Sequence, residues 1–225
     1  MIDRGGLDSR PDRPHRKQAA ALCVQKGIRS MCNHSVHFYQ DEYPAAEAAE
    51  FLAAGLLAGD ACIVLLGKTH RVAVESRLRA LGFDIDDEQA RSGAYVAIDA
   101  DQALLQLVVD GRLSGDRARE VLDSIFTQAG QGGTRSVRAV GEPAPLLFAA
   151  GNQADALKLE RLVDSLAKAH GAAVFCAYPI SPFCQEGALS ALFSICGEHS
   201  LLRFPQGAWF QGKMPPPPAV AASAT

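Results

Sequence analysis

Short apolar runs alternate with amphipathic stretches along most of the chain. Six of these runs predict β-strands, at 35–39, 61–66, 94–99, 136–141, 172–178 and 201–204. The runs at 61–66 and 172–178 are continuously apolar, which is typical of central parallel strands covered on both faces. The run at 201–204 is predicted to close one edge of the sheet.

Between these runs, apolar residues recur at helical spacing. The clearest stripe stands at i, i+3, i+4 and i+7 and consists of Leu159, Leu162, Val163 and Leu166. Further helices are predicted in the run that begins at Ala45, around Val74, and over 101–110 and 116–129. Gly82 and Gly171 stand where C-terminal helix caps are expected. This alternation predicts an α/β fold: a three-layer, mostly parallel sheet flanked by helices in a single domain.

The two ends of the chain differ in composition from its middle. Residues 1–30 contain seven Lys or Arg and three Asp, with little apolar periodicity, and a proline run marks the other end. We therefore predict a disordered basic extension at 1–32, a folded domain at 33–206 and a disordered Pro/Ala-rich tail at 207–225. An alternative is that Met31 is the true first residue.

Composition narrows the classes of protein to consider. The net charge of −3 argues against a nucleic-acid partner, and no apolar run is long enough to predict a membrane span. Six irregularly spaced cysteines, with no C-x-x-C pair, indicate reduced thiols used mainly in packing. We therefore expect a cytoplasmic protein.

Ligands of parallel sheets bind beyond the carboxyl ends of the strands. In this chain those positions hold polar and aromatic residues: Tyr39, Gln40, Asp41, Gly67, Lys68, Thr69, His70, Asp99, Asp101, Glu142, Tyr178 and Pro179. They predict a mostly acidic rim. Glu142 resembles the acidic residue that orders water or Mg²⁺ in ATPases, and it could equally place its carboxylate at a helix N-terminus.

The spacing of two other patterns argues against a phosphate loop and against a metal-binding histidine pair. Gly67-Lys68-Thr69 matches the end of a phosphate loop, but the first glycine that such a loop requires is replaced by Cys62 inside an apolar run. His34 and His37 have an odd spacing on a predicted strand, so they point to opposite faces and cannot share one ion. We predict no metal site and no cofactor.

Several blocks, taken in order, resemble the MEDS sensory domain family, named for methanogens, methylotrophs and a regulator of dichloromethane metabolism. They include HSVHFYQDE, LAAGLLAGDACIVLL, VRAVGEPAPLLFAAGN, LKLERLVDSLAKAH, FCAYPISPF and GEHS. The resemblance implies a RecA/KaiC-like fold without intact Walker motifs, and a non-catalytic sensor of small molecules such as hydrocarbon derivatives. The ligand-binding residues that it implies are His34, Tyr39, Asp41, Glu142, Asn152, Tyr178 and His199. Pro143 and Pro145 depart from the family pattern and stiffen a predicted loop over 142–152.

The resulting hypothesis is a sensory module that binds a small molecule or a partner protein at the carboxyl ends of the strands. It would act in two-component or transcriptional signalling through a partner, a histidine kinase or a regulator, and could form a homo-oligomer. No nucleic acid or membrane is expected as a partner. The alternatives are a residual nucleotide-binding, ATPase-like protein, an oligomeric adaptor without a small ligand, and a thiol-based redox sensor.

Overall fold

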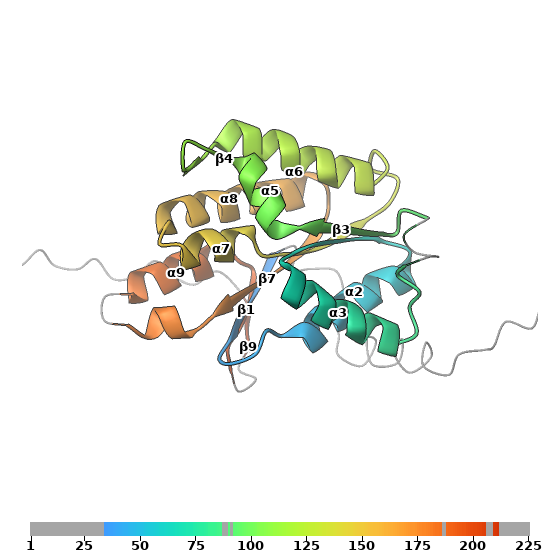
Figure 1. Cartoon of the computed structure of the whole chain (residues 1–225), viewed down its shortest axis with the longest axis horizontal. Helices are drawn as coiled ribbons and strands as arrows, with labels where there is room; N and C mark the ends of the chain where they lie inside the picture. Colours follow the sequence, from blue (N-terminus) through green and yellow to red (C-terminus); the bar gives the residue numbers. More distant parts are fainter. Residues whose placement is uncertain (1–33, 87–89, 91, 186–187, 206–208, 212–225) are drawn as a thin grey trace, which may run out of the picture.

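The computed structural model describes residues 34–86, 90, 92–185, 188–205 and 209–211, which form one sheet with helices on both faces (Figure 1). The sheet has seven strands in the order β3-β2-β6-β7-β1-β8-β9. Their bounds are β1 His34–Tyr39, β2 Ala61–Leu66, β3 Tyr95–Asp99, β6 Val137–Gly141, β7 Ala173–Pro179, β8 Leu201–Arg203 and β9 Trp209–Gln211. Neighbouring strands are parallel except β8 and β9.

Within the described residues, two helices cover one face of the sheet and five lie on the other. Figure 1 shows these two helical layers. The first face carries α2 (Ala45–Ala58) and α3 (Lys68–Ala80). The second carries α5 (Ala100–Leu107), α6 (Gly115–Ala129), α7 (Pro143–Ala149), α8 (Gln153–Ala169) and α9 (Leu189–Gly197). A short helix, η1 (Ser181–Cys184), follows β7, and a small hairpin of β4 (Val108–Val109) and β5 (Arg112–Leu113) follows α5. The predicted three-layer α/β architecture is confirmed.

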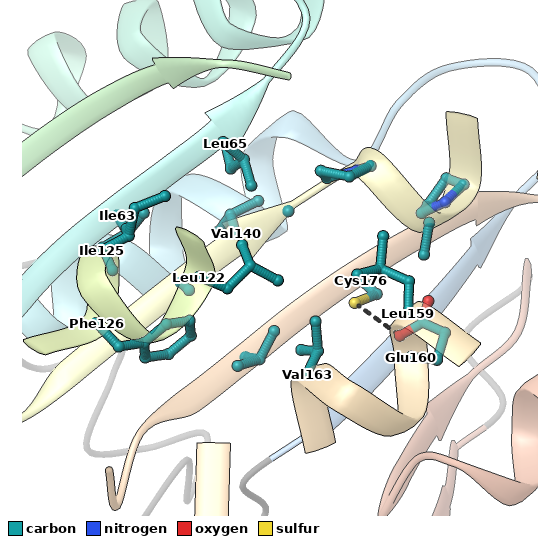
Figure 2. A pocket seen from close by; sticks show the side chains of 16 residues that line it. Ile63, Leu65, Leu122, Ile125, Phe126, Val140, Leu159, Glu160, Val163 and Cys176 are labelled. Atoms are coloured by element: carbon teal, nitrogen blue, oxygen red, sulfur yellow. Dashed lines mark hydrogen bonds between the residues drawn. The ribbon is translucent and has the colours of Figure 1, made fainter. Parts of the chain in front are cut away.

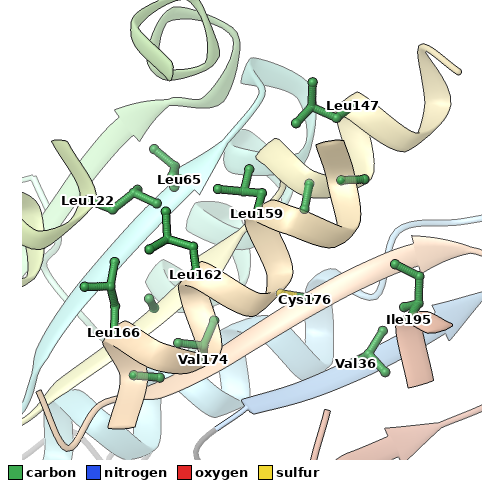
Figure 3. Packing of buried hydrophobic residues seen from close by; sticks show 14 of the residues in the cluster. Val36, Leu65, Leu122, Leu147, Leu159, Leu162, Leu166, Val174, Cys176 and Ile195 are labelled. Atoms are coloured by element: carbon green, nitrogen blue, oxygen red, sulfur yellow. The ribbon is translucent and has the colours of Figure 1, made fainter. Parts of the chain in front are cut away.

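The larger core lies between the sheet and the second helical layer. The predicted stripe of α8 is buried there, with Leu159, Leu162 and Leu166 packed over Val174 and Cys176 of β7 (Figure 3). The continuous apolar sequence of β2 and β7 is explained by burial on both faces, because their side chains alternate between the two cores.

The predicted strands are confirmed within one residue at either end. The strand at 201–203 does not form the edge, however, because β9 pairs with it on the outside. The helix predicted over 101–110 ends at Leu107, because the next residues turn back at Asp110 and Gly111, both with positive φ, to form the β4–β5 hairpin. Gly82 and Gly171 have positive φ just beyond α3 and α8, as expected of helix caps.

The loop predicted over 142–152 is largely a helix, α7. Pro143 occupies the first helical position, where the missing N–H is not needed and the fixed φ of proline suits the helix. Pro145 is also in the first turn, so neither ring meets a carbonyl of a preceding turn. The two prolines therefore start a helix here, and the prediction of a loop was wrong.

Two expectations from the sequence concern the ends of the chain and membrane-spanning helices. The predicted extension at 1–32 and nearly all of the predicted tail at 207–225 lie outside them. None of the helices in the described ranges is long and apolar enough to cross a membrane.

Alternation along β1 separates its two histidines, as predicted. Val36 and Phe38 belong to the core under α7–α9, and His34 is on their side of the strand. The ring of His37 lies on the opposite side, 4.0 Å from the ring of Phe175 between centroids. The two histidines therefore serve different environments.

The stability of the fold is expected to depend on His37 between pH 7 and pH 5. Burial, together with the charge of Arg203, lowers the pKa of His37 to about 3, so the native ring stays neutral while the unfolded ring takes up a proton below about pH 6.5. Stability is therefore lost as the pH falls through this range, by roughly 2 kcal/mol at pH 5. Urea unfolding at both pH values should show that wild type loses this much more than His37→Gln. Equal losses in the two proteins would contradict the assignment.

Candidate functional site

Glu142 joins the carboxyl ends of two central strands. It follows β6 and is buried, and its Oε2 accepts a hydrogen bond of 2.7 Å from the backbone N–H of Gly67. Its other carboxylate oxygen contacts Nδ1 of His70 in the first turn of α3. Because Gly67 is the N-cap residue of α3, this arrangement corresponds to the helix-terminus alternative for Glu142.

An aromatic stack stands beside this carboxylate. The ring of Tyr43 stacks on His70, with centroids 4.2 Å apart, and Tyr39 meets Tyr43 edge-on at 5.8 Å. The Tyr43 hydroxyl is buried and has no hydrogen-bond partner in the described part of the chain. Burial and the nearby carboxylate of Glu142 raise the pKa of Tyr43, so this group is a neutral O–H donor.

The stack forms one wall of a groove of about 890 Å³, here called the rim groove. Its other walls come from the start of α2, one side of α3 and the segment Arg203–Pro205. Gln40 and Glu42 line it, whereas Asp41 is exposed outside it. The connection from β1 to α2 contains no glycine, and α2 begins at Ala45.

The predicted site residues do not form one site. Tyr39 lines the rim groove and Glu142 lies behind its wall, but His34 and His199 stand at the amino ends of β1 and β8. Asn152 occupies the N-cap position of α8, and its side chain makes no capping hydrogen bond. The interpretation of all these residues as a single rim is therefore wrong.

Five buried side chains meet between β1, β7, α8 and α9, here called the inner cluster. They are His34, Glu160, Cys176, Tyr178 and His199. Glu160 is central: its Oε2 lies 3.2 Å from Nε2 of His34 and 3.4 Å from Nε2 of His199. Tyr178 donates a hydrogen bond of 2.5 Å to Oε1 of the same carboxylate. The two imidazole rings lie against each other with centroids 3.9 Å apart.

Burial decides the protonation of the inner cluster. It lowers the pKa of His34 and raises the pKa of Cys176 and Tyr178 well above their usual values. Burial alone would also raise the pKa of Glu160, but His199 and His34 outweigh it and hold that pKa below its usual value. The carboxylate is therefore ionised and surrounded by O–H and S–H donors and imidazole nitrogens.

A cavity of about 50 Å³ opens beside the inner cluster, here called the α7 cavity (Figure 2). Its walls are apolar and come from β2, β6, β7, α6, α7 and α8, including Pro143, Ala144 and Pro145 of α7. Glu160 and Cys176 stand at one end of it, and the thiol points to the carboxylate oxygen at 3.6 Å. One water needs roughly 10–15 Å³ on this scale, so the α7 cavity suits a molecule of a few heavy atoms.

Sequence reasoning missed Glu160 and took Cys176 for packing. Glu160 stands in the buried face of α8 with Ala156 and Ala167, and a charged residue in such a stripe is a recognisable signal of a buried site. Cys176 and Tyr178 are two residues apart on β7, so they point to the same face. Periodicity could have paired them, but it could not bring His34 or His199 to them.

The surroundings of Gly67-Lys68-Thr69 agree with the expectation that no phosphate loop forms there. Cys62, at the position of the missing glycine, is buried in β2 and directs its thiol to the carbonyl of Leu52 at 3.3 Å. Lys68 is exposed at the start of α3. The backbone before Gly67 is thus a strand of the sheet and leaves no turn to wrap a phosphate.

Comparison with known proteins adds one finding. The model of the family described as MEthanogen/methylotroph, DcmR Sensory domain matches residues 33–194, most of the chain. No curated protein matches the chain.

Proposed function

The chain belongs to the MEthanogen/methylotroph, DcmR Sensory domain family, and we propose that it is a non-catalytic sensory module for a small, mainly apolar molecule. The proposed site is the α7 cavity. The observation that carries this proposal is an apolar cavity with two polar side chains, Glu160 and Cys176, at one end. A hydrocarbon derivative with one polar or halogen group matches that distribution in size and polarity.

The position of the α7 cavity supplies a route for the signal. α7 covers the cavity with its first turn, and the residue before it, Glu142, is bonded to the start of α3. A ligand that fills the α7 cavity would favour one position of α7 over another, and Glu142 would carry the change to the rim groove. We propose that a signalling partner, a histidine kinase or a regulator, responds to that surface.

Filling the α7 cavity is expected to abolish binding of the small molecule. In Ala144→Leu the larger side chain projects into the cavity, whereas in Ala149→Leu the added carbons are exposed on the same helix. Thermal unfolding with a panel of C1–C4 alcohols, aldehydes and haloalkanes should show stabilisation of wild type and Ala149→Leu. A ligand at 100 times its Kd stabilises by about 2.7 kcal/mol, and Ala144→Leu should lose this gain.

The rim groove is the competing location, favoured by the Tyr43 hydroxyl, which has no hydrogen-bond partner among the residues that the structure describes. Tyr43→Ala distinguishes the two, since Tyr43 lines the rim groove and not the α7 cavity. Binding that survives Ala144→Leu and is lost in Tyr43→Ala would move the ligand to the rim groove and overturn the proposal. A panel without any stabilising compound would count against small-molecule sensing of this class.

A further inference from the structure

We propose that the inner cluster binds one divalent transition-metal ion of the Zn²⁺ class through four side-chain atoms. The atoms are Nε2 of His34, Oε2 of Glu160, Sγ of Cys176 and Nε2 of His199. This site goes beyond the proposed sensory function, and although it shares Glu160 and Cys176 with the end of the α7 cavity, its test measures bound metal and needs no small molecule. It differs from the His34–His37 pair excluded by strand geometry, because three of its ligands come from other parts of the fold.

The spacing of the four atoms fits a tetrahedral ion. Metal–ligand bonds of about 2.0–2.3 Å place neighbouring ligand atoms about 3.3–3.8 Å apart. The His34 nitrogen lies 3.2 Å from the Glu160 oxygen and 3.4 Å from the Cys176 sulfur. That oxygen lies 3.4 Å from the His199 nitrogen and 3.6 Å from the sulfur. All four atoms lie within 4.8 Å of one another.

The tautomer of His199 is a second, independent observation. Its Nδ1 lies 2.7 Å from the backbone carbonyl of Ile195, which can only accept, so Nδ1 carries the proton. With one proton held at Nδ1, Nε2 is the ring nitrogen that faces Oε2 of Glu160, at 3.4 Å. This nitrogen is fully buried and makes no hydrogen bond within the described residues. A cation between nitrogen and oxygen satisfies both atoms.

Neighbouring groups hydrogen-bond to two of the four ligand side chains and orient them. The Ile195 carbonyl orients His199, as backbone carbonyls commonly do for metal-bound imidazoles. Tyr178 donates to Oε1 of Glu160 and leaves Oε2 free to bind as a single oxygen ligand. The carboxylate of Asp164 lies 3.9 Å from Nδ1 of His34, beyond hydrogen-bond distance, and Nδ1 makes no hydrogen bond to the described residues. Two of the four ligand side chains, His199 and Glu160, are thus held in place by further hydrogen bonds.

The chemical types of the four ligands favour Zn²⁺ over Mg²⁺ and Ca²⁺. One thiolate, two imidazoles and one carboxylate in tetrahedral spacing suit Zn²⁺, whereas Mg²⁺ and Ca²⁺ prefer oxygen ligands only. On binding, the Cys176 thiol transfers its proton to solvent and the sulfur takes the metal in its place. Four protein ligands make a closed site, which would join β1, β7, α8 and the segment before β8.

Metal content and cobalt spectra of the full chain test the site. Protein purified from zinc-containing medium without chelator should carry about one Zn²⁺ per chain. After chelator treatment, Co²⁺ should restore one equivalent with strong visible bands of tetrahedral coordination and a thiolate-to-cobalt band in the near ultraviolet. Added Zn²⁺ should remove these bands. Absence of both zinc and cobalt bands would overturn the proposal.

Variants assign the ligands. Cys176→Ser should lose the thiolate-to-cobalt band, and Cys62→Ser, a buried thiol under the opposite helical layer, should keep it. Tyr178→Phe retains all four ligands and should weaken Zn²⁺ binding about 10–100-fold, as loss of an outer-shell partner does. Circular dichroism checks that each variant is folded. A near-ultraviolet band that persists in folded Cys176→Ser would overturn the assignment even if metal is bound elsewhere.

Discussion

Replacing Glu160 with alanine is expected to lower the free energy of unfolding by about 3–5 kcal/mol. The carboxylate is fully buried and accepts the hydrogen bond of Tyr178, while the two histidines contact its other oxygen. Its removal leaves the Tyr178 hydroxyl without an acceptor and opens a void at the end of the α7 cavity. Urea unfolding at pH 7 of chelator-treated protein gives the loss without any contribution from metal.

Two further variants identify the cause of this loss. Glu160→Gln retains an oxygen for Tyr178 but not the charge, and should cost less, about 1–2 kcal/mol. Asp123→Ala removes a carboxylate that is 53% exposed and pairs with His170, so its effect should stay within about 0.5 kcal/mol. A loss below about 1 kcal/mol in Glu160→Ala would contradict the buried network described for this residue.

Replacing Arg138 with alanine is expected to cost about 2–4 kcal/mol. The guanidinium projects from β6 beneath α2, where Nε donates to Asp60 at 2.8 Å and the charge lies 5.3 Å from the ring centroid of Phe51. Both partners of the ion pair are only 15% exposed, so the variant leaves the Asp60 carboxylate largely buried without its cation. Urea unfolding at pH 7 measures the loss.

A double-mutant cycle with Gly55 tests this geometry. A Cβ on Gly55 would stand 2.5 Å from Cδ of Arg138, so Gly55→Ala should cost about 1–3 kcal/mol in wild type. In the Arg138→Ala background the closest obstacle is gone and only the contact with Sγ of Cys62 at 3.1 Å remains. Alanine is also the better helix former by up to about 1 kcal/mol, so most of the cost should disappear. Gly115→Ala, at an open position of α6, should have the same small effect in both backgrounds. Additive costs at Gly55 would contradict the packing of Arg138.

Local sequence alone determined most elements of the sheet. Continuous apolar runs identified β2 and β7, because a strand that is buried on both faces needs apolar residues at consecutive positions. Helical spacing identified α8, because a helix that is buried on one face needs apolar residues three or four positions apart. The same reasoning placed His34 and His37 on opposite faces of β1. The ordered blocks also identified the sensory family, which the match over residues 33–194 confirms.

Only the tertiary structure revealed the short secondary-structure elements and the residues that make up the inner cluster. The β4–β5 hairpin and α9 are short segments whose apolar residues are ambiguous until they pack. The inner cluster contains residues from β1, α8, β7 and the segment before β8. These segments meet because the strand order places β1 between β7 and β8, and local sequence does not determine that order. The family resemblance named His34 and His199 as site residues. The α8 stripe could have marked Glu160 as buried, but its contacts with both histidines are visible only once α8 is packed across the sheet.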